Sequence, residues 1–357
     1  MSPSGPDRRL VLAGGAAALV AARGGSPGYD AIVAKPGRPA PRGKRHDSLG
    51  TALADAPARG SYRIWLGTGT WVEKLAIRTA NVEIVGEDRH ASRIRFDAAA
   101  GLKDSGGKPW GTFGSATLTV TAPGFRAGNL TIENGFDPVE EARRSGLTLG
   151  DWPGGQQAVA LALASGSDGA RLHAVDVLGR QDTLYVENEA RFDHCLVTGT
   201  VDFVFGGGRA LLADCEIRSR LRPPAQPAGG VIAAPSTRAD REAGLIFDRC
   251  RLTAEPGVPA ACVYLGRAWR PTRSFPDGRY GDPQALGMAA YIDCVMGPHI
   301  APTGWTEMGF NAPGGVRSAL QPETARFYEA GNRGLGAKGE RRSRQLDATL
   351  RARLFAG

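Results

Sequence analysis

An internal repeat of 20 residues constrains the fold of this chain more than any other feature. Segments beginning at Ala170, Ala190 and Ala210 align as ARLHAVDVLG, ARFDHCLVTG and ALLADCEIRS. Two columns of this alignment are apolar or cysteine: Val175, Cys195 and Cys215, and Val177, Val197 and Ile217. A period near 20 with two or three short strands favours a parallel β-helix, in which each coil stacks on the last.

The rest of the chain agrees with an all-β solenoid. Looser copies of the repeat begin at Phe247 and Tyr291, and the leucine-rich-repeat signature of similar period is absent. Glycine accounts for 50 of 357 residues, and 42% of residues are hydrophobic, which suits a chain with frequent turns and a substantial core. We expect one domain over residues 26–357.

Short helices are predicted at both ends of the solenoid. Near the start, apolar residues at helical spacing are Leu49, Ala52, Leu53 and Ala56. Near the end, Leu346, Leu350 and Leu354 lie at i, i+4 and i+8, on one face of a helix. Such helices would cap the ends, where strand edges are otherwise unpaired.

The N-terminus has the layout of an export signal. Residues 7–22 contain the twin arginines Arg8 and Arg9, then a short Gly/Ala/Leu/Val run. We expect residues 1–25 to direct export to the periplasm or the outside, and the twin arginines favour the twin-arginine route; the alternative is a disordered extension. No later stretch of 18 apolar residues predicts a membrane span.

The five cysteines form no C-x-x-C pair, and the five histidines are scattered, so we expect no metal and no cofactor. Cys195 and Cys215 are one period apart. Stacked coils would bring their Cα atoms within disulfide range, which favours a bridge in an exported protein. The alternative is a ladder of buried free cysteines.

The formal net charge of +8 and the pI near 9.5 favour a polyanionic partner. Nucleic acid and an acidic polysaccharide both satisfy that requirement. The basic residues form no dense stripe interleaved with aromatics, so charge alone does not choose between them.

Two carboxylates and two carboxamides recur near the repeat period. Asp182 and Asp202 are 20 residues apart, and Gln157 precedes Gln181 by 24. A β-helix would gather all four on neighbouring coils. Two close carboxylates in different environments can divide acid and nucleophile roles, and two carboxamides can stabilise an oxyanion. This set suits acyl transfer or glycoside cleavage; the alternative is that these side chains satisfy turn backbones.

Two further observations bear on this chemistry. Asp202 lies between Val201 and Phe203, so burial would raise its pKa unless a cation compensates. In the segment YLGRAW, Arg267 and Trp269 could bind a uronate and stack on a sugar ring. The alternative for this second pair is a salt bridge and a partly buried tryptophan.

At these residues the chain resembles the pectin methylesterases (pectinesterases), specifically the bacterial secreted type. The motifs that carry the resemblance are GTFGSAT from Gly111, QAVAL from Gln157, QDTLY from Gln181, GTVDFVFG from Gly199, LGRAW from Leu265 and GWTEM from Gly304. Together with the opening YDAIV at Tyr29, they cover roughly residues 28–355.

The resemblance implies a right-handed parallel β-helix that hydrolyses the C6 methyl esters of polygalacturonate. By motif, Asp202 would be the nucleophile, and Gln157 and Gln181 the oxyanion hole. Asp182 would be acid and then base, and Arg267 would orient Asp202. The implied partner is methylated pectin rather than nucleic acid, with no metal or organic cofactor, and we expect a monomer.

The same motifs imply a sugar groove and a disulfide. The groove would be lined by Thr112, Tyr185, Phe205, Trp269, Thr272 and Met308, and the Cys195–Cys215 bridge has a counterpart in bacterial relatives. Three departures from the family pattern stand out: Ala268 in place of proline, Val204 in place of isoleucine, and a longer segment at 301–303.

Three rival hypotheses are open from the sequence. A β-helical glycoside hydrolase or lyase would not need the paired glutamines. A non-catalytic carbohydrate-binding relative would have substituted site residues, whereas all five reacting residues are present. An esterase for a non-pectin ester is the rival that the motifs exclude least.

Overall fold

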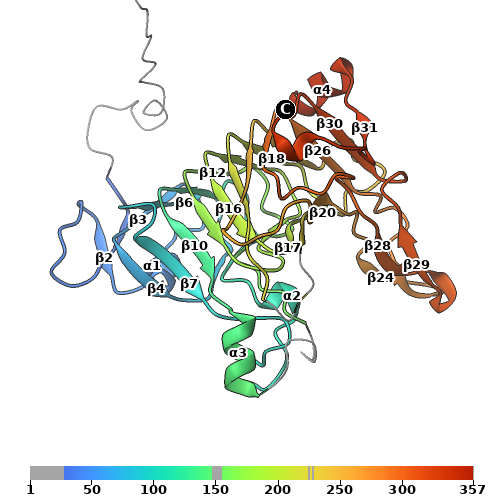
Figure 1. The fold of residues 1–357 in the computed structure, drawn as a ribbon. Helices are drawn as coiled ribbons and strands as arrows, with labels where there is room; N and C mark the ends of the chain where they lie inside the picture. Colours follow the sequence, from blue (N-terminus) through green and yellow to red (C-terminus); the bar gives the residue numbers. More distant parts are fainter. Residues whose placement is uncertain (1–27, 147–154, 224–225, 227–228, 357) are drawn as a thin grey trace, which may run out of the picture.

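The computed structural model describes residues 28–146, 155–223, 226 and 229–356. Its strands stack along one axis, from the N-terminal coil to the C-terminal coils (Figure 1). The export signal expected within residues 1–25 lies outside the described residues. No described helix is long and apolar enough to cross a membrane.

Three long parallel sheets build the body. The 12-stranded sheet has the order β2-β1-β3-β6-β9-β12-β15-β18-β21-β26-β30-β31. Its strands are β1 (Ala31–Val33), β2 (Lys44–His46), β3 (Tyr62–Leu66), β6 (Val82–Gly86), β9 (Arg126–Gly128), β12 (Ala170–His173), β15 (Ala190–Asp193), β18 (Ala210–Ala213), β21 (Leu245–Asp248), β26 (Met288–Ile292), β30 (Arg326–Ala330) and β31 (Arg344–Gln345).

The 8-stranded sheet has the order β27-β22-β19-β16-β13-β10-β7-β4. Its strands are β4 (Gly69–Val72), β7 (Ser92–Phe96), β10 (Thr131–Asn134), β13 (Asp176–Leu178), β16 (Leu196–Gly199), β19 (Glu216–Ser219), β22 (Arg251–Ala254) and β27 (Val295–Met296). The 7-stranded sheet has the order β23-β20-β17-β14-β11-β8-β5. Its strands are β5 (Leu75–Ile77), β8 (Leu118–Val120), β11 (Leu161–Leu163), β14 (Leu184–Val186), β17 (Val201–Gly206), β20 (Gly230–Pro235) and β23 (Val263–Gly266).

The register confirms the repeat read from the sequence. Ala190 pairs with Ala170 on one side and Ala210 on the other, each 20 residues away. Inward side chains such as Leu172, Phe192 and Leu212 are buried in one continuous core. The fold class, a parallel β-helix, is therefore confirmed.

A tight corner between the 12-stranded and 8-stranded sheets recurs in coil after coil. The corner residue has φ between 50° and 56° at Asn129, Ala174, His194, Asp214, Arg249 and Asp293. This left-handed conformation costs most L-residues about 1–2 kcal/mol, and Asn and Asp tolerate it best. The preference explains the Asn and Asp residues among these corners.

Both predicted terminal helices form, and they pack differently. In α1 (Leu49–Ala54), Ser48 caps the N-terminus and Leu49 and Ala52 enter the interior core. In α4 (Ala348–Phe355), Leu354 is buried against outward side chains of β18, β21 and β26. The second helix thus covers the side of the C-terminal coils, because those strands carry apolar residues on their outer face as well.

Several smaller elements project from the body. Two hairpins, β24 (Thr272–Phe275) with β25 (Gly278–Gly281) and β28 (Met308–Asn311) with β29 (Arg317–Leu320), extend beside the C-terminal coils (Figure 1). The remaining helices are α2 (Gly111–Gly114), α3 (Pro138–Ser145) and the 3-10 turns Pro313–Gly315 and Leu335–Ala337.

The disulfide predicted between Cys195 and Cys215 is not formed in the structure. All five cysteines are free, and Cys195, Cys215, Cys250 and Cys294 are buried. The Cys195 backbone N–H lies 3.3 Å from Cys215 Sγ. The two thiols point to the carbonyl oxygens of Asp193 and Ala213 at 3.4 and 3.3 Å. The 20-residue repeat therefore places the two cysteines on neighbouring coils, as predicted. They form a ladder of free thiols, and each thiol has a carbonyl oxygen as its hydrogen-bond acceptor.

Candidate active site

The 7-stranded sheet carries the residues predicted to react. Gln157 precedes β11, Asp182 precedes β14, Asp202 lies within β17 and Arg267 follows β23. These strands are successive members of one sheet, with only β20 between β17 and β23. Residues up to 110 positions apart in the chain therefore meet within a few coils.

Asp182 and Asp202 share an unusual backbone conformation. Their φ angles are 61° and 51°, in the left-handed region. Asp202 also sits at a register shift, because Val201 pairs with Val231 whereas Val204 pairs with Ala233. Such a bulge gives one strand an extra residue and redirects its side chains. Strained backbone of this kind clusters at functional sites.

Asp202 is held by Arg267 through two parallel hydrogen bonds. Arg267 Nε donates to Oδ1 at 2.9 Å, and Nη2 donates to Oδ2 at 2.7 Å. The Asp202 side chain is only 8% exposed. A bidentate, charge-assisted pair fixes the direction of the carboxylate as well as its charge.

The two carboxyl groups have different environments. Burial raises the pKa of Asp202, and the hydrogen bonds and charge of Arg267 oppose that shift. Burial raises the pKa of Asp182 well above its ordinary value, and the nearby charge of Asp202 raises it further. Arg267 acts on Asp182 only as a weaker opposing charge. This difference favours an ionised Asp202 beside a protonated Asp182.

The two glutamines lie on adjacent coils beside this pair. The backbone N–H of Ala158 donates to the carbonyl oxygen of Gln181 at 3.0 Å, which holds the two turns together. The Gln181 side chain is hydrogen-bonded to Asp182. Gln157 Oε1 is buried without a partner among the described residues. A buried carboxamide oxygen without a hydrogen-bond partner lowers the stability of the folded state. The Gln157 side chain is therefore able to form a further hydrogen bond with a ligand.

Aromatic rings line the surface next to the carboxylates. The ring centroids of Tyr185 and Phe205 are 5.0 Å apart, and those of Phe205 and Trp269 are 5.9 Å apart. Phe113 from α2 joins the row, 4.7 Å from Tyr185, and is 50% exposed. Phe205 itself is only 3% exposed, so the ring faces available to sugar rings are those of Phe113 and of the partly buried Tyr185 and Trp269.

Sequence reasoning missed Phe113. Phe113 lies in the motif GTFGSAT, but a phenylalanine in a sequence is typical of a buried core residue, so nothing marked it as a surface ring. Thr112, which was predicted, precedes it in α2. Thr272 and Met308 are placed in the hairpin strands β24 and β28, outside the aromatic row.

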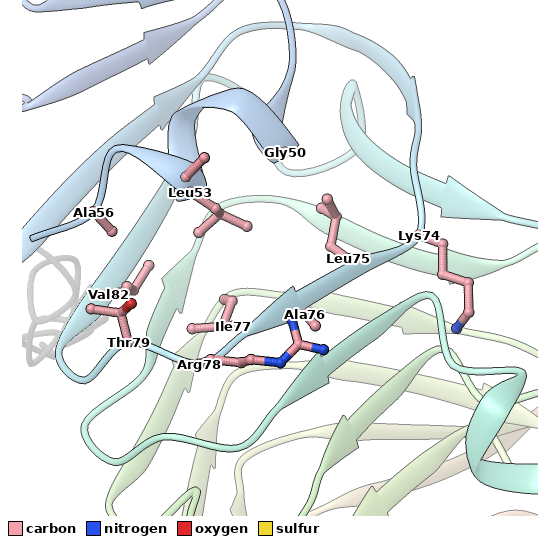
Figure 2. Close-up of a pocket in the computed structure, with 11 residues that line it drawn as sticks. Gly50, Leu53, Ala56, Lys74, Leu75, Ala76, Ile77, Arg78, Thr79 and Val82 are labelled. Atoms are coloured by element: carbon pink, nitrogen blue, oxygen red, sulfur yellow. The ribbon is translucent and has the colours of Figure 1, made fainter. Parts of the chain in front are cut away.

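A separate cavity of about 350 Å³ lies between α1 and β5, at the N-terminal coil (Figure 2). Its charged lining residues are Lys74 and Arg78, and it contains none of the predicted reacting residues. Within the described ranges, no three His, Cys, Asp or Glu side chains gather into a metal site. The carboxylate pair on the 7-stranded sheet is thus the candidate catalytic centre.

The chain is similar to known proteins along most of its length. The family model for pectinesterase matches residues 30–347. The chain belongs to the pectinesterase family. It is 37% identical to pectinesterase A of Dickeya dadantii (strain 3937) over 326 residues, which is 89% of this chain and 87% of that protein.

Solved pectinesterase structures agree with the fold. A pectin methylesterase from Erwinia chrysanthemi matches with a TM-score of 0.84 and 36% identity, over 92% of this chain and 95% of the other. One from Yersinia enterocolitica matches with a TM-score of 0.82 and 40% identity, over 87% and 97%. The residues matched by the family model, 30–347, span the β-helix from β1 to β31.

Proposed function

We propose that this protein hydrolyses the methyl esters of pectin to pectate and methanol, with Asp202 as the nucleophile. The single observation that carries the proposal is the pairing of a buried carboxylate, fixed by Arg267, with a second carboxyl group of strongly raised pKa. The family to which the chain belongs supports the same reaction.

The first half-reaction forms an acyl-enzyme. An oxygen of the Asp202 carboxylate attacks the ester carbonyl carbon, and negative charge develops on the carbonyl oxygen. The carboxamides of Gln157 and Gln181 donate hydrogen bonds to that oxygen. When the intermediate collapses, the bond to the methoxy oxygen breaks, and Asp182 gives its proton to the departing methanol.

The second half-reaction restores the enzyme. Asp182, now ionised, takes a proton from a water molecule, and the water oxygen attacks the acyl carbon. The bond to Asp202 breaks, and the product leaves as a carboxylic acid that then loses its proton to water, with Asp202 again ionised and Asp182 again protonated. Arg267 stays bound to Asp202 throughout and keeps the attacking carboxylate oriented.

Substrate binding is assigned to the aromatic row and the hairpins. Tyr185 and Trp269 would stack on galacturonate rings, with Thr112, Phe205, Thr272 and Met308 lining the groove. Methylated pectin is the partner that this lining favours over nucleic acid. We infer that the enzyme acts as a monomer after export to the periplasm or beyond.

The direct test is methanol release from highly methylated pectin, with polymer size followed in parallel. Wild-type protein should release methanol without shortening the chain, and Asp202→Asn should not release it. The Asp176→Asn variant is a control, because Asp176 is also buried and paired with an arginine but lies on the 8-stranded sheet. Methanol release that survives in the Asp202→Asn variant would overturn the nucleophile assignment.

A further inference from the structure

A row of three arginines runs along the outside of the 12-stranded sheet, away from the catalytic residues. Arg171 of β12 pairs in register with Arg126 of β9 on one side and Arg191 of β15 on the other. All three side chains are exposed. The residue that follows each arginine in the sequence faces the core: Ala127, Leu172 and Phe192. We call Arg126, Arg171 and Arg191 the arginine row.

Two of the three charges have no acidic partner. Arg191 is paired with Asp193 at 2.7 Å, and the neighbouring Glu189 is paired with Arg209. On the other side, Glu83 is paired with Arg63. No carboxylate oxygen of the described residues lies within 4.0 Å of the Arg126 or Arg171 guanidinium, whereas Arg63 and Arg191 in the same row are paired.

Like charges at directly opposed positions of neighbouring strands are destabilising. In-register neighbours are about 4.8 Å apart, so the Arg126 and Arg171 side chains stand side by side. An acidic or neutral residue at one of these two positions would remove the repulsion. The neighbouring in-register positions show this, because Glu83 pairs with Arg126 and Leu211 pairs with Arg191. The unpaired charges therefore suggest a ligand that supplies the missing negative charge.

We propose that the arginine row is a second binding surface for the de-esterified, polyanionic part of the pectin chain. This inference rests on the proposed function. Arginine suits carboxylates because its planar fork binds them in a bidentate manner.

The location of the row fits an anchoring role. It lies on the 12-stranded sheet, whereas Asp182 and Asp202 belong to the 7-stranded sheet. In Figure 1, β6, β12 and β18 of the first sheet run along one side of the β-helix, and α2 and the β24–β25 hairpin lie on another. A pectate segment bound to the row thus leaves the catalytic groove free and holds the enzyme on polymer that has already been processed.

The test is binding of the full chain to long polygalacturonate that carries no methyl esters, at several salt concentrations. The Arg126→Gln/Arg171→Gln variant should bind about three- to tenfold more weakly at low salt, as expected for two exposed charge contacts. Its salt dependence should also be shallower, because fewer counterions are displaced. Methanol release from a short methylated oligomer, which reaches only the groove, should match the wild type.

Two further variants make the result decisive. Arg42→Gln/Arg59→Gln removes the same charge from exposed positions near the N-terminus and should bind like the wild type. Arg126→Lys/Arg171→Lys should retain most of the binding. Equal binding by wild type and the Arg126→Gln/Arg171→Gln variant, or equal loss in the N-terminal control, would overturn the proposal. Absence of methanol release by the wild type would instead contradict the proposed function, because the binding assay needs no catalysis.

Discussion

Arg267 reaches Asp202 from a strand that lies two positions away in the 7-stranded sheet, with β20 between them. Its Nε and Nη2 atoms donate to the two carboxylate oxygens at 2.9 and 2.7 Å. Arg267 follows β23 directly, and its backbone N–H donates to the carbonyl oxygen of Ala233 in β20. The sheet backbone therefore sets the position of the guanidinium that orients the nucleophile.

Replacing Arg267 should move the acid limb of the activity profile. Arg267 lowers the pKa of Asp202 against the effect of burial, so Arg267→Ala should raise that pKa further. Because the nucleophile must be ionised, the acid limb of kcat/KM should shift to higher pH, and its plateau should fall about 100-fold or more. Arg267→Lys keeps the charge but loses the bidentate geometry, so its limb should shift less. A pH–rate profile with an unmoved acid limb in Arg267→Ala would contradict the role assigned to the pair.

Replacing Asp182 should slow both half-reactions. Asp182→Asn keeps the shape of the side chain but can neither donate nor accept the proton, so kcat should fall about 10²- to 10⁴-fold. Mass spectrometry of a quenched reaction measures how much acyl-enzyme accumulates on Asp202 and so shows which half-reaction is slowed more. Asp182→Glu, which retains a carboxyl group, is the control. If Asp182→Asn turned over at the wild-type rate, another group would have to supply the proton.

The same residue should control stability against pH. Burial raises the folded-state pKa of Asp182 above its unfolded value, so the folded state holds a proton that the unfolded state releases. Its contribution to stability is present below the unfolded pKa and is lost as pH rises through the folded pKa. Asp182→Asn should therefore unfold at a higher temperature than the wild type at neutral pH and at a similar temperature near pH 3. Thermal unfolding across that range tests the sign, and a constant difference would contradict it.

Removing the Phe113 ring should weaken substrate binding more than chemistry. The ring is half exposed and packs on Tyr185, which positions it at the surface of the aromatic row. Phe113→Ala should raise KM about tenfold, corresponding to about 1.4 kcal/mol, with kcat little changed. Val316→Ala, an exposed apolar residue of the β28–β29 turn, is a matched control. Steady-state kinetics on methylated pectin distinguish the two, and an unchanged KM would remove Phe113 from the groove.

Restoring proline at position 268 should stabilise the turn after β23. Arg267 and Trp269 donate their backbone N–H groups to Ala233 and Pro235, and Ala268 lies buried between them. Ala268→Pro should raise the free energy of unfolding by about 0.4–1 kcal/mol through a less flexible unfolded chain. Denaturant unfolding measures this change, with Ala268→Gly expected to move it in the opposite direction. Destabilisation by proline would show that this backbone does not accept the family's residue.

Much of the site was predictable because a β-helix converts sequence period into distance. Asp182 and Asp202 are one period apart, and the structure places them on neighbouring coils with matching left-handed backbones. Arg267 is 65 residues beyond Asp202, and the coils between them are irregular in length. Only the resemblance to pectinesterases linked that arginine to the pair, because spacing carries no information once loops of variable length intervene.

The repeated apolar pattern of the sequence is sufficient to predict the stacking of coils, the all-β class and the grouping of the reacting side chains. What depends on side-chain direction follows only from the folded structure. It left Cys195 and Cys215 as thiols, laid α4 against an apolar outer face, and exposed Phe113 beside Tyr185. It also decided the protonation of the carboxyl pair. Burial acts on both groups, and only the geometry shows that Arg267 binds one of them directly.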